Sequence, residues 1–138
     1  MGFFDNILKK VGSFLATRYG VVLAGKYEGC DIALGNPPTE TVSTSESLSQ
    51  MIFFKEKEEV ARIDIAEEIK ELVFVEMIHF SATNDDCYSC VITFADGEVS
   101  KFVLYPNRAK GFYKNLKGKM PDETCAFLEK EIAKLTKV

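Results

Sequence analysis

Two cysteines in a C-x-x-C spacing, Cys87 and Cys90, are the residues that most directly suggest chemistry. A zinc site needs a second pair of ligands, and a redox pair usually opens a helix whose dipole lowers the pKa of one thiol. Cys30 and Cys125 stand alone in the sequence, and the residues around Cys87 predict a strand, on which positions three apart face opposite sides. We therefore expect no metal site, no cofactor and four reduced thiols.

His79 is the only histidine and lies in the apolar run LVFVEMIHF. A lone histidine in such a run is more often packed or exposed than a general base, and no nucleophile can be placed beside it. Carboxylates are numerous but no motif selects a pair, and the glycine spacings match no phosphate-binding loop. We expect the protein not to be an enzyme.

Basic residues form the strongest charge feature of the chain. Residues 99–121 contain six basic residues and no acidic one, whereas residues 40–98 contain fourteen acidic residues and four basic ones, within a net charge of −4. The six are Lys101, Arg108, Lys110, Lys114, Lys117 and Lys119. They either form a solvated face that balances the acidic half of the molecule, or bind an anionic lipid surface or an acidic protein segment. Nucleic acid is not an expected partner, because the chain is acidic overall and carries no recognised module.

A hairpin around Asp96-Gly97 precedes most of these basic residues. A two-residue turn would pair Ile92 with Lys101 and place a charge in an apolar row. A three-residue turn with Gly97 in the left-handed conformation pairs Ile92 with Ser100 instead. A shift of the strand pairing by one residue would turn the apolar side chains to the other face, so a buried face specifies the register. The predicted inward face then consists of Tyr88, Cys90, Ile92, Phe94, Phe102 and Leu104.

Two helices are predicted after this hairpin. Pro106 ends the strand, and Asn107 is expected to cap a helix over residues 107–118. A second helix over residues 121–136 begins near Pro121, which suits a first turn. The buried stripes are Ala109, Phe112 and Leu116 in the first helix and Cys125, Leu128, Ile132 and Leu135 in the second. We expect Arg108, Lys114 and Lys117 on the outer face of the first helix, Lys110 and Lys119 at its flanks, and Lys101 on the adjoining strand.

Earlier segments alternate between strands and turns. Strands are predicted over residues 21–24, 27–34, 51–55 and 60–65, with a mobile, Ser- and Thr-rich loop over residues 36–50. Asp64 and Glu67 have the spacing of a capping box, so we expect at most one helical turn before a strand over residues 72–82.

An amphipathic helix is predicted over residues 2–18. Its apolar stripe consists of Phe3, Phe4, Ile7, Leu8, Val11, Phe14 and Leu15. The stripe either covers an opening of its own domain, forms a dimer interface, or inserts shallowly into a membrane with Lys9 and Lys10 near the headgroups.

The order of about seven short strands followed by a C-terminal helix resembles bacterial pleckstrin-homology-like and GRAM-like domains. The segments ARIDI (61–65), ITFADGE (92–98) and AKGFYKNL (109–116) carry the resemblance, which covers residues 20–118. It implies an antiparallel barrel of the α+β class that binds lipid headgroups, peptides or partner proteins, usually without catalysis.

With 138 residues, the chain has the size of a single domain over residues 1–138, and no run approaches the roughly 20 apolar residues that span a bilayer. We predict a cytoplasmic binding or adaptor module, peripheral at a membrane if lipid is its ligand, that uses helix 107–118. The alternative is a structural protein that forms a homo-oligomer through the apolar face of helix 2–18.

Overall fold

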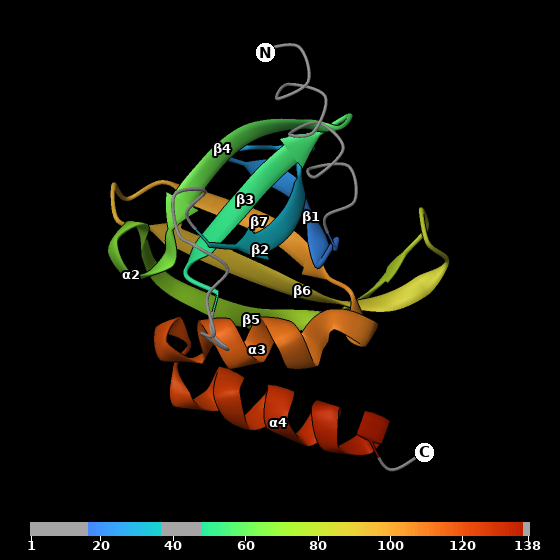
Figure 1. Ribbon diagram of the computed structural model, residues 1–138. Coiled ribbons are helices and arrows are strands. Elements are labelled where there is room, and N and C mark those ends of the chain that lie inside the picture. The colour runs from blue at the N-terminus through green and yellow to red at the C-terminus, as the bar shows by residue number, and fades with distance from the viewer. Residues whose placement is uncertain (1–16, 37–47, 137–138) are drawn as a thin grey trace.

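The computed structural model describes residues 17–36 and 48–136, which form an α+β fold (Figure 1). One antiparallel sheet has seven strands in the order β4-β3-β2-β1-β7-β6-β5. The strands are β1 (Gly20–Gly25), β2 (Asp31–Gly35), β3 (Gln50–Lys55), β4 (Glu58–Asp64), β5 (Ile69–Phe80), β6 (Asp85–Phe94) and β7 (Val99–Leu104). The helices are α2 (Ile65–Glu68), α3 (Ala109–Leu116) and α4 (Asp122–Thr136), with 3-10 turns η1 (Pro106–Arg108) and η2 (Lys117–Lys119) around α3.

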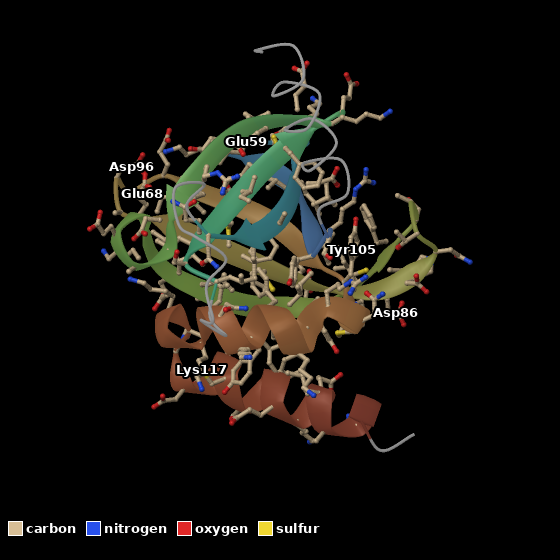
Figure 2. The ribbon with its side chains drawn as sticks, in the orientation of Figure 1. Glu59, Glu68, Asp86, Asp96, Tyr105 and Lys117 are labelled. Atoms are coloured by element: carbon tan, nitrogen blue, oxygen red, sulfur yellow. The ribbon has the colours of Figure 1, made fainter. Side chains whose placement is uncertain are left out.

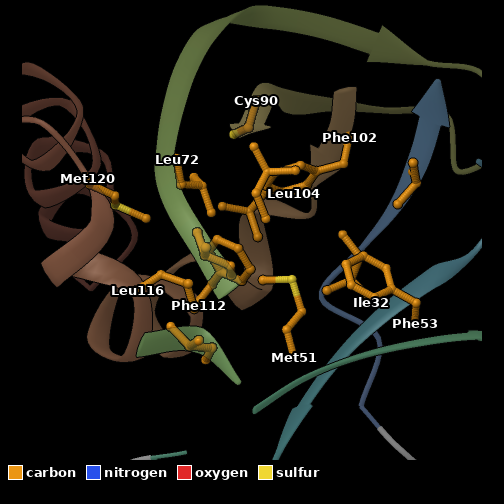
Figure 3. Packing of buried hydrophobic residues seen from close by; sticks show 14 of the residues in the cluster. Ile32, Met51, Phe53, Leu72, Cys90, Phe102, Leu104, Phe112, Leu116 and Met120 are labelled. Carbon is orange, nitrogen blue, oxygen red and sulfur yellow. The ribbon is translucent and has the colours of Figure 1, made fainter. Parts of the chain in front are cut away.

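The sheet curves around one hydrophobic core, α3 lies beside β5 at the open side, and α4 packs against α3 (Figure 1). Core side chains come from every strand and from both of these helices, including Ile32, Phe53, Phe102, Phe112 and Leu128. Figure 3 shows Phe112 and Leu116 of α3 reaching into this core. We call the face of the sheet that lines this core the inner face.

The hairpin between β6 and β7 has the predicted register. Ile92 pairs with Ser100, Cys90 with Phe102 and Tyr88 with Leu104. Gly97 has φ of 91°, as a left-handed turn position requires. The six residues predicted to point inward all belong to the core cluster. The prediction is confirmed, because a shift by one residue would have placed Lys101 in this apolar row.

One helical turn precedes β5, as predicted. The Asp64 carboxylate accepts a hydrogen bond from the Glu67 backbone N–H (3.0 Å), which is the first half of a capping box. The returning bond comes from Glu68, whose carboxylate accepts from the Asp64 N–H (2.8 Å). β5 begins at Ile69, earlier than predicted, because that side chain already packs in the core and is 1% exposed.

Several predicted boundaries are wrong. Thr17 and Arg18 are not helical, so a helix over residues 2–18 cannot extend that far, and residues 2–16 lie outside the described part of the chain. The strand predicted from Tyr27 begins only at Asp31, because Tyr27 has φ of 64° in a turn. Gln50 belongs to β3 rather than to the predicted loop, of which residues 37–47 are not described.

The helix after Pro106 also begins differently. Asn107 lies within η1 and does not cap α3; Arg108 occupies the N-cap position, without a side-chain hydrogen bond. Pro106 favours a tight turn here, in which the Arg108 N–H donates to the Tyr105 carbonyl (2.9 Å). α4 begins at Asp122, one residue after Pro121.

α4 contacts the free edge of β5 at Phe74. The Phe74 N–H donates to the Thr124 hydroxyl (3.1 Å), which satisfies a donor that an edge strand leaves unpaired. Phe127 stacks on Phe74 with ring centroids 3.9 Å apart. Of the predicted buried stripe, Leu128 is fully buried, Cys125 and Ile132 are half-buried, and the side chain of Leu135 is outside the described part.

Candidate functional site

Four sides of α3 have different neighbours. Ala109, Phe112 and Leu116 face the core and are 0% exposed. Tyr113 lies on the side of α4, beside Glu129. On the opposite side, the Asn115 side chain accepts a hydrogen bond from the Leu48 N–H (2.7 Å). The remaining side therefore faces solvent.

Three lysines occupy this solvent-facing side: Lys110, Lys114 and Lys117. We call them the lysine stripe. Their spacing of four and three residues places their side chains on one line along the helix. All three are exposed, and none forms an ion pair with a described residue. Lys114 and Lys117 also lie at the C-terminal end of α3, where the helix dipole favours positive charge.

The other predicted basic residues lie apart from the lysine stripe. Lys101 points away from α3. Its neighbour Phe102 faces inward, with its ring centroid 5.7 Å from that of Phe112, and successive residues of a strand point to opposite faces. Lys119 is half-buried, and its ammonium group donates to the Ala66 carbonyl (2.8 Å), so it ties η2 to α2. Arg108 lies six residues before Lys114, which is about 240° around an α-helix of 3.6 residues per turn, so the two side chains do not lie on one line.

The predicted grouping therefore needs one correction. Lys110 belongs to the exposed line with Lys114 and Lys117, and Arg108 does not. The sequence did contain the signal, because residues 110, 114 and 117 interleave with the buried residues 109, 112 and 116 at helical spacing. Lys117 is labelled in Figure 2 at the end of α3.

Acidic residues border the lysine stripe on the side of α4. Burial and the adjacent Glu129 carboxylate raise the pKa of Tyr113 to about 12. Asp122 and Glu123 are exposed in the first turn of α4. The positive surface is thus narrow, one helix face wide.

A separate pocket lies between the β5–β6 turn and the end of β7. It has a volume of about 400 Å³ and is lined by Thr83, Asp85, Asp86, Cys87, Tyr105, Pro106 and Asn107. Tyr105 and Asp86 mark it in Figure 2. No sequence pattern signalled this pocket, because its lining comes from two segments about twenty residues apart.

The chemistry of this pocket does not favour catalysis. Burial raises the pKa of the Cys87 thiol, so its thiolate population at neutral pH is small. His79 is nearby on β5, but its ring nitrogens contact Asp86 and Asn84 (3.2 Å each) rather than the thiol. The residues that line the pocket therefore provide no nucleophile activated by a base.

The C-x-x-C pair is divided between the two faces of the sheet, as its strand position predicted. Cys90 lies in the core, where burial raises the pKa of its thiol to about 12, and Cys87 lies on the opposite face. All four cysteines are free. Among the described residues, no group of three histidine, cysteine, aspartate or glutamate side chains is arranged to hold a metal ion.

No protein-family model, curated protein or solved structure matches the chain. None of the helices in the described ranges is long and apolar enough to cross a bilayer.

Proposed function

We propose that this chain is a non-catalytic binding module whose lysine stripe contacts an anionic membrane surface. The observation that carries the proposal is the exposure of Lys110, Lys114 and Lys117 on one line, without an ion pair to any described residue. Cations that merely balanced the acidic half of the molecule would be expected to pair with it. These three do not.

The fold supports a pleckstrin-homology-like scaffold. Seven antiparallel strands curve around one core and C-terminal helices cover its open side, which is the order on which the resemblance rests. The second C-terminal helix, α4, departs from that order. Such barrels usually bind rather than catalyse, and the pocket around Cys87 fits this because its thiol is protonated.

The shape of the surface favours a membrane over a small anion. The lysine stripe lies on a convex helix face, and the pocket around Cys87 is lined by other residues. A convex row of cations suits the distributed negative charge of a lipid surface. Each lysine contributes about 1 kcal/mol of binding free energy. Three lysines give about 3 kcal/mol by the same rule, which predicts weak, salt-dependent attachment. The cytoplasmic leaflet carries the anionic lipids, so a cytoplasmic, peripheral location accompanies the proposal.

Co-sedimentation with phosphatidylserine-containing vesicles tests the proposal. The variant Lys114→Glu with Lys117→Glu should bind at least about 30-fold more weakly than the natural chain, because it loses about 2 kcal/mol of attraction. Lys130→Glu with Lys134→Glu in α4 is the matched control, with the same change of net charge on another helix. It should retain most of the binding.

Two results would count against the proposal. Absence of vesicle binding at low ionic strength overturns the membrane contact, and binding of polyglutamate under the same conditions would then identify an acidic protein segment as the partner. Equal losses in the two variants would mean that net charge, rather than the lysine stripe, governs binding.

A further inference from the structure

The face of the sheet that points away from the core, the outer face, is crossed by a row of directly paired residues. Ser89 of β6 pairs with Val103 of β7, Val103 with Val21 of β1, Val21 with Asp31 of β2, and Asp31 with Phe54 of β3. Directly paired residues on antiparallel strands point to the same face. We call these five residues the outer row, and none belongs to the core cluster.

Three of the five residues of the outer row are buried although they do not face the core, and Val21 and Asp31 are partly exposed. Ser89 and Val103 are 0% exposed and Phe54 is 1% exposed. A sheet face that meets water keeps its side chains partly exposed, so these values require a second layer. The two longer described helices, α3 and α4, pack against the inner face through Phe112 and Leu128. They are therefore not that layer.

The Ser89 hydroxyl indicates that the layer above it is apolar. It is buried without a hydrogen-bond partner among the described residues. Asp31 is only partly covered: its side chain is 23% exposed and pairs with Arg18, while burial raises its pKa and that of the adjacent Tyr105. A polar cover would supply a partner to Ser89.

We propose that the outer row is the docking site of residues 2–15 of this same chain, packed through their apolar side chains. That stripe consists of Phe3, Phe4, Ile7, Leu8, Val11, Phe14 and Leu15. It supplies seven apolar side chains and, on that side, no polar group that would reach Ser89.

The position where the described chain begins supports this occupant. The Arg18 guanidinium lies 3.8 Å from the Asp31 carboxylate and 5.9 Å from the centre of the Phe54 ring. The chain therefore emerges at the β2–β3 end of the outer row. A helix of fourteen residues is about 21 Å long, and the four strand spacings from Phe54 to Ser89 amount to about 19 Å. Residues 2–15 are thus long enough to cross the whole row.

The sheet would then have an apolar layer on each side, α3 and α4 on one and residues 2–15 on the other. While residues 2–15 are docked, their apolar side chains are not available to a membrane or to a second copy of the chain. The proposal is independent of the lysine stripe, which lies on the far side of the sheet.

Substitutions in the full chain test the docking. Ile7→Asp with Val11→Asp places two carboxylates in the apolar stripe, and Asn6→Asp with Ser13→Asp places two on the opposite side as the matched control. The first pair should shift the NMR signals of the Val21 and Val103 methyl groups and raise the fluorescence of a bound hydrophobic dye several-fold. The Leu128 methyl signals, which report on the inner core, should stay unchanged in both variants.

A measurement on the natural chain needs no substitution. Nuclear Overhauser contacts are expected between the ring protons of Phe3, Phe4 or Phe14 and the methyl groups of Val21 or Val103. Their absence overturns the proposal, even if the double aspartate variant fails to fold. Light scattering should show a monomer. A dimer that Ile7→Asp with Val11→Asp converts to a monomer would instead identify a second copy as the occupant.

Discussion

Both faces of the sheet contain fully buried side chains, but their sequence patterns differ. The inner face presents an apolar row, with Cys90, Phe102 and Leu104 each 0% exposed. The outer row includes Asp31 and Ser89, yet Val103 and Phe54 within it are 0% and 1% exposed. Alternation of apolar and polar residues along a strand therefore does not reveal whether the second face meets water, because a covered second face can keep polar residues.

The largest predicted change in stability tests whether the two faces of the sheet are equally well packed. Phe102→Ala on the inner face should lower the free energy of unfolding by about 4 kcal/mol, and Phe54→Ala on the outer face by about 3 kcal/mol, because both remove a fully buried ring. Urea denaturation measures both. If Phe54→Ala costs less than about 0.5 kcal/mol, the usual range for a surface substitution, the outer face is open in solution.

Two buried serines should respond with opposite signs. The Ser100 hydroxyl donates to the Lys26 carbonyl, whereas the Ser89 hydroxyl has no partner in the described part of the chain. Ser100→Ala should therefore destabilise the protein by about 1 kcal/mol, and Ser89→Ala should stabilise it by a similar amount. Thermal unfolding of both variants checks this, and destabilisation by Ser89→Ala would indicate a hydrogen bond to a water molecule within the outer layer.

The smallest expected effect is a difference in pH dependence between two aspartates. Burial raises the pKa of Asp31 in the folded state. The protein therefore loses stability as the pH rises from the unfolded-state pKa of Asp31 through its folded-state pKa. The hydrogen bond from Lys26 lowers the pKa of Asp96, whose contribution is present above the unfolded-state pKa and is lost as the pH falls through the folded-state pKa.

Asp31→Asn should accordingly gain stability relative to the natural chain as the pH rises from acid to neutral, and Asp96→Asn should lose it. Urea denaturation over a series of pH values measures both trends. A common sign for the two variants would contradict the assignment of Asp31 to a covered surface.

The hairpin and α3 were predictable because the information is local. β6 and β7 are joined by a short turn, so the apolar alternation and Lys101 leave one register in which the inward face is free of charge. The buried face of α3 follows from the spacing of Ala109, Phe112 and Leu116.

The features that the sequence did not predict depend mostly on contacts between segments that are distant in sequence. The outer row joins Val21 to Val103 and Asp31 to Phe54, and no local pattern brings these residues together. Lys101 belongs to the acid-free run in sequence but points to the opposite side of the sheet from α3, which only the packing of Phe102 on Phe112 reveals. Asn107 would cap a helix in isolation, but Pro106 begins a tighter turn first.

The contact between Thr124 and the Phe74 N–H has a consequence for assembly. β5 is a twelve-residue edge strand, long enough to act as a template for another chain, but α4 bonds to it at Phe74 and two register shifts interrupt it. At the other edge, β4 presents Glu58 to solvent, whose charge opposes pairing with an identical strand, while Glu59 pairs with Arg62. Growth of this sheet into a fibril is therefore opposed at one side by a helix contact and register shifts, and at the other by charge.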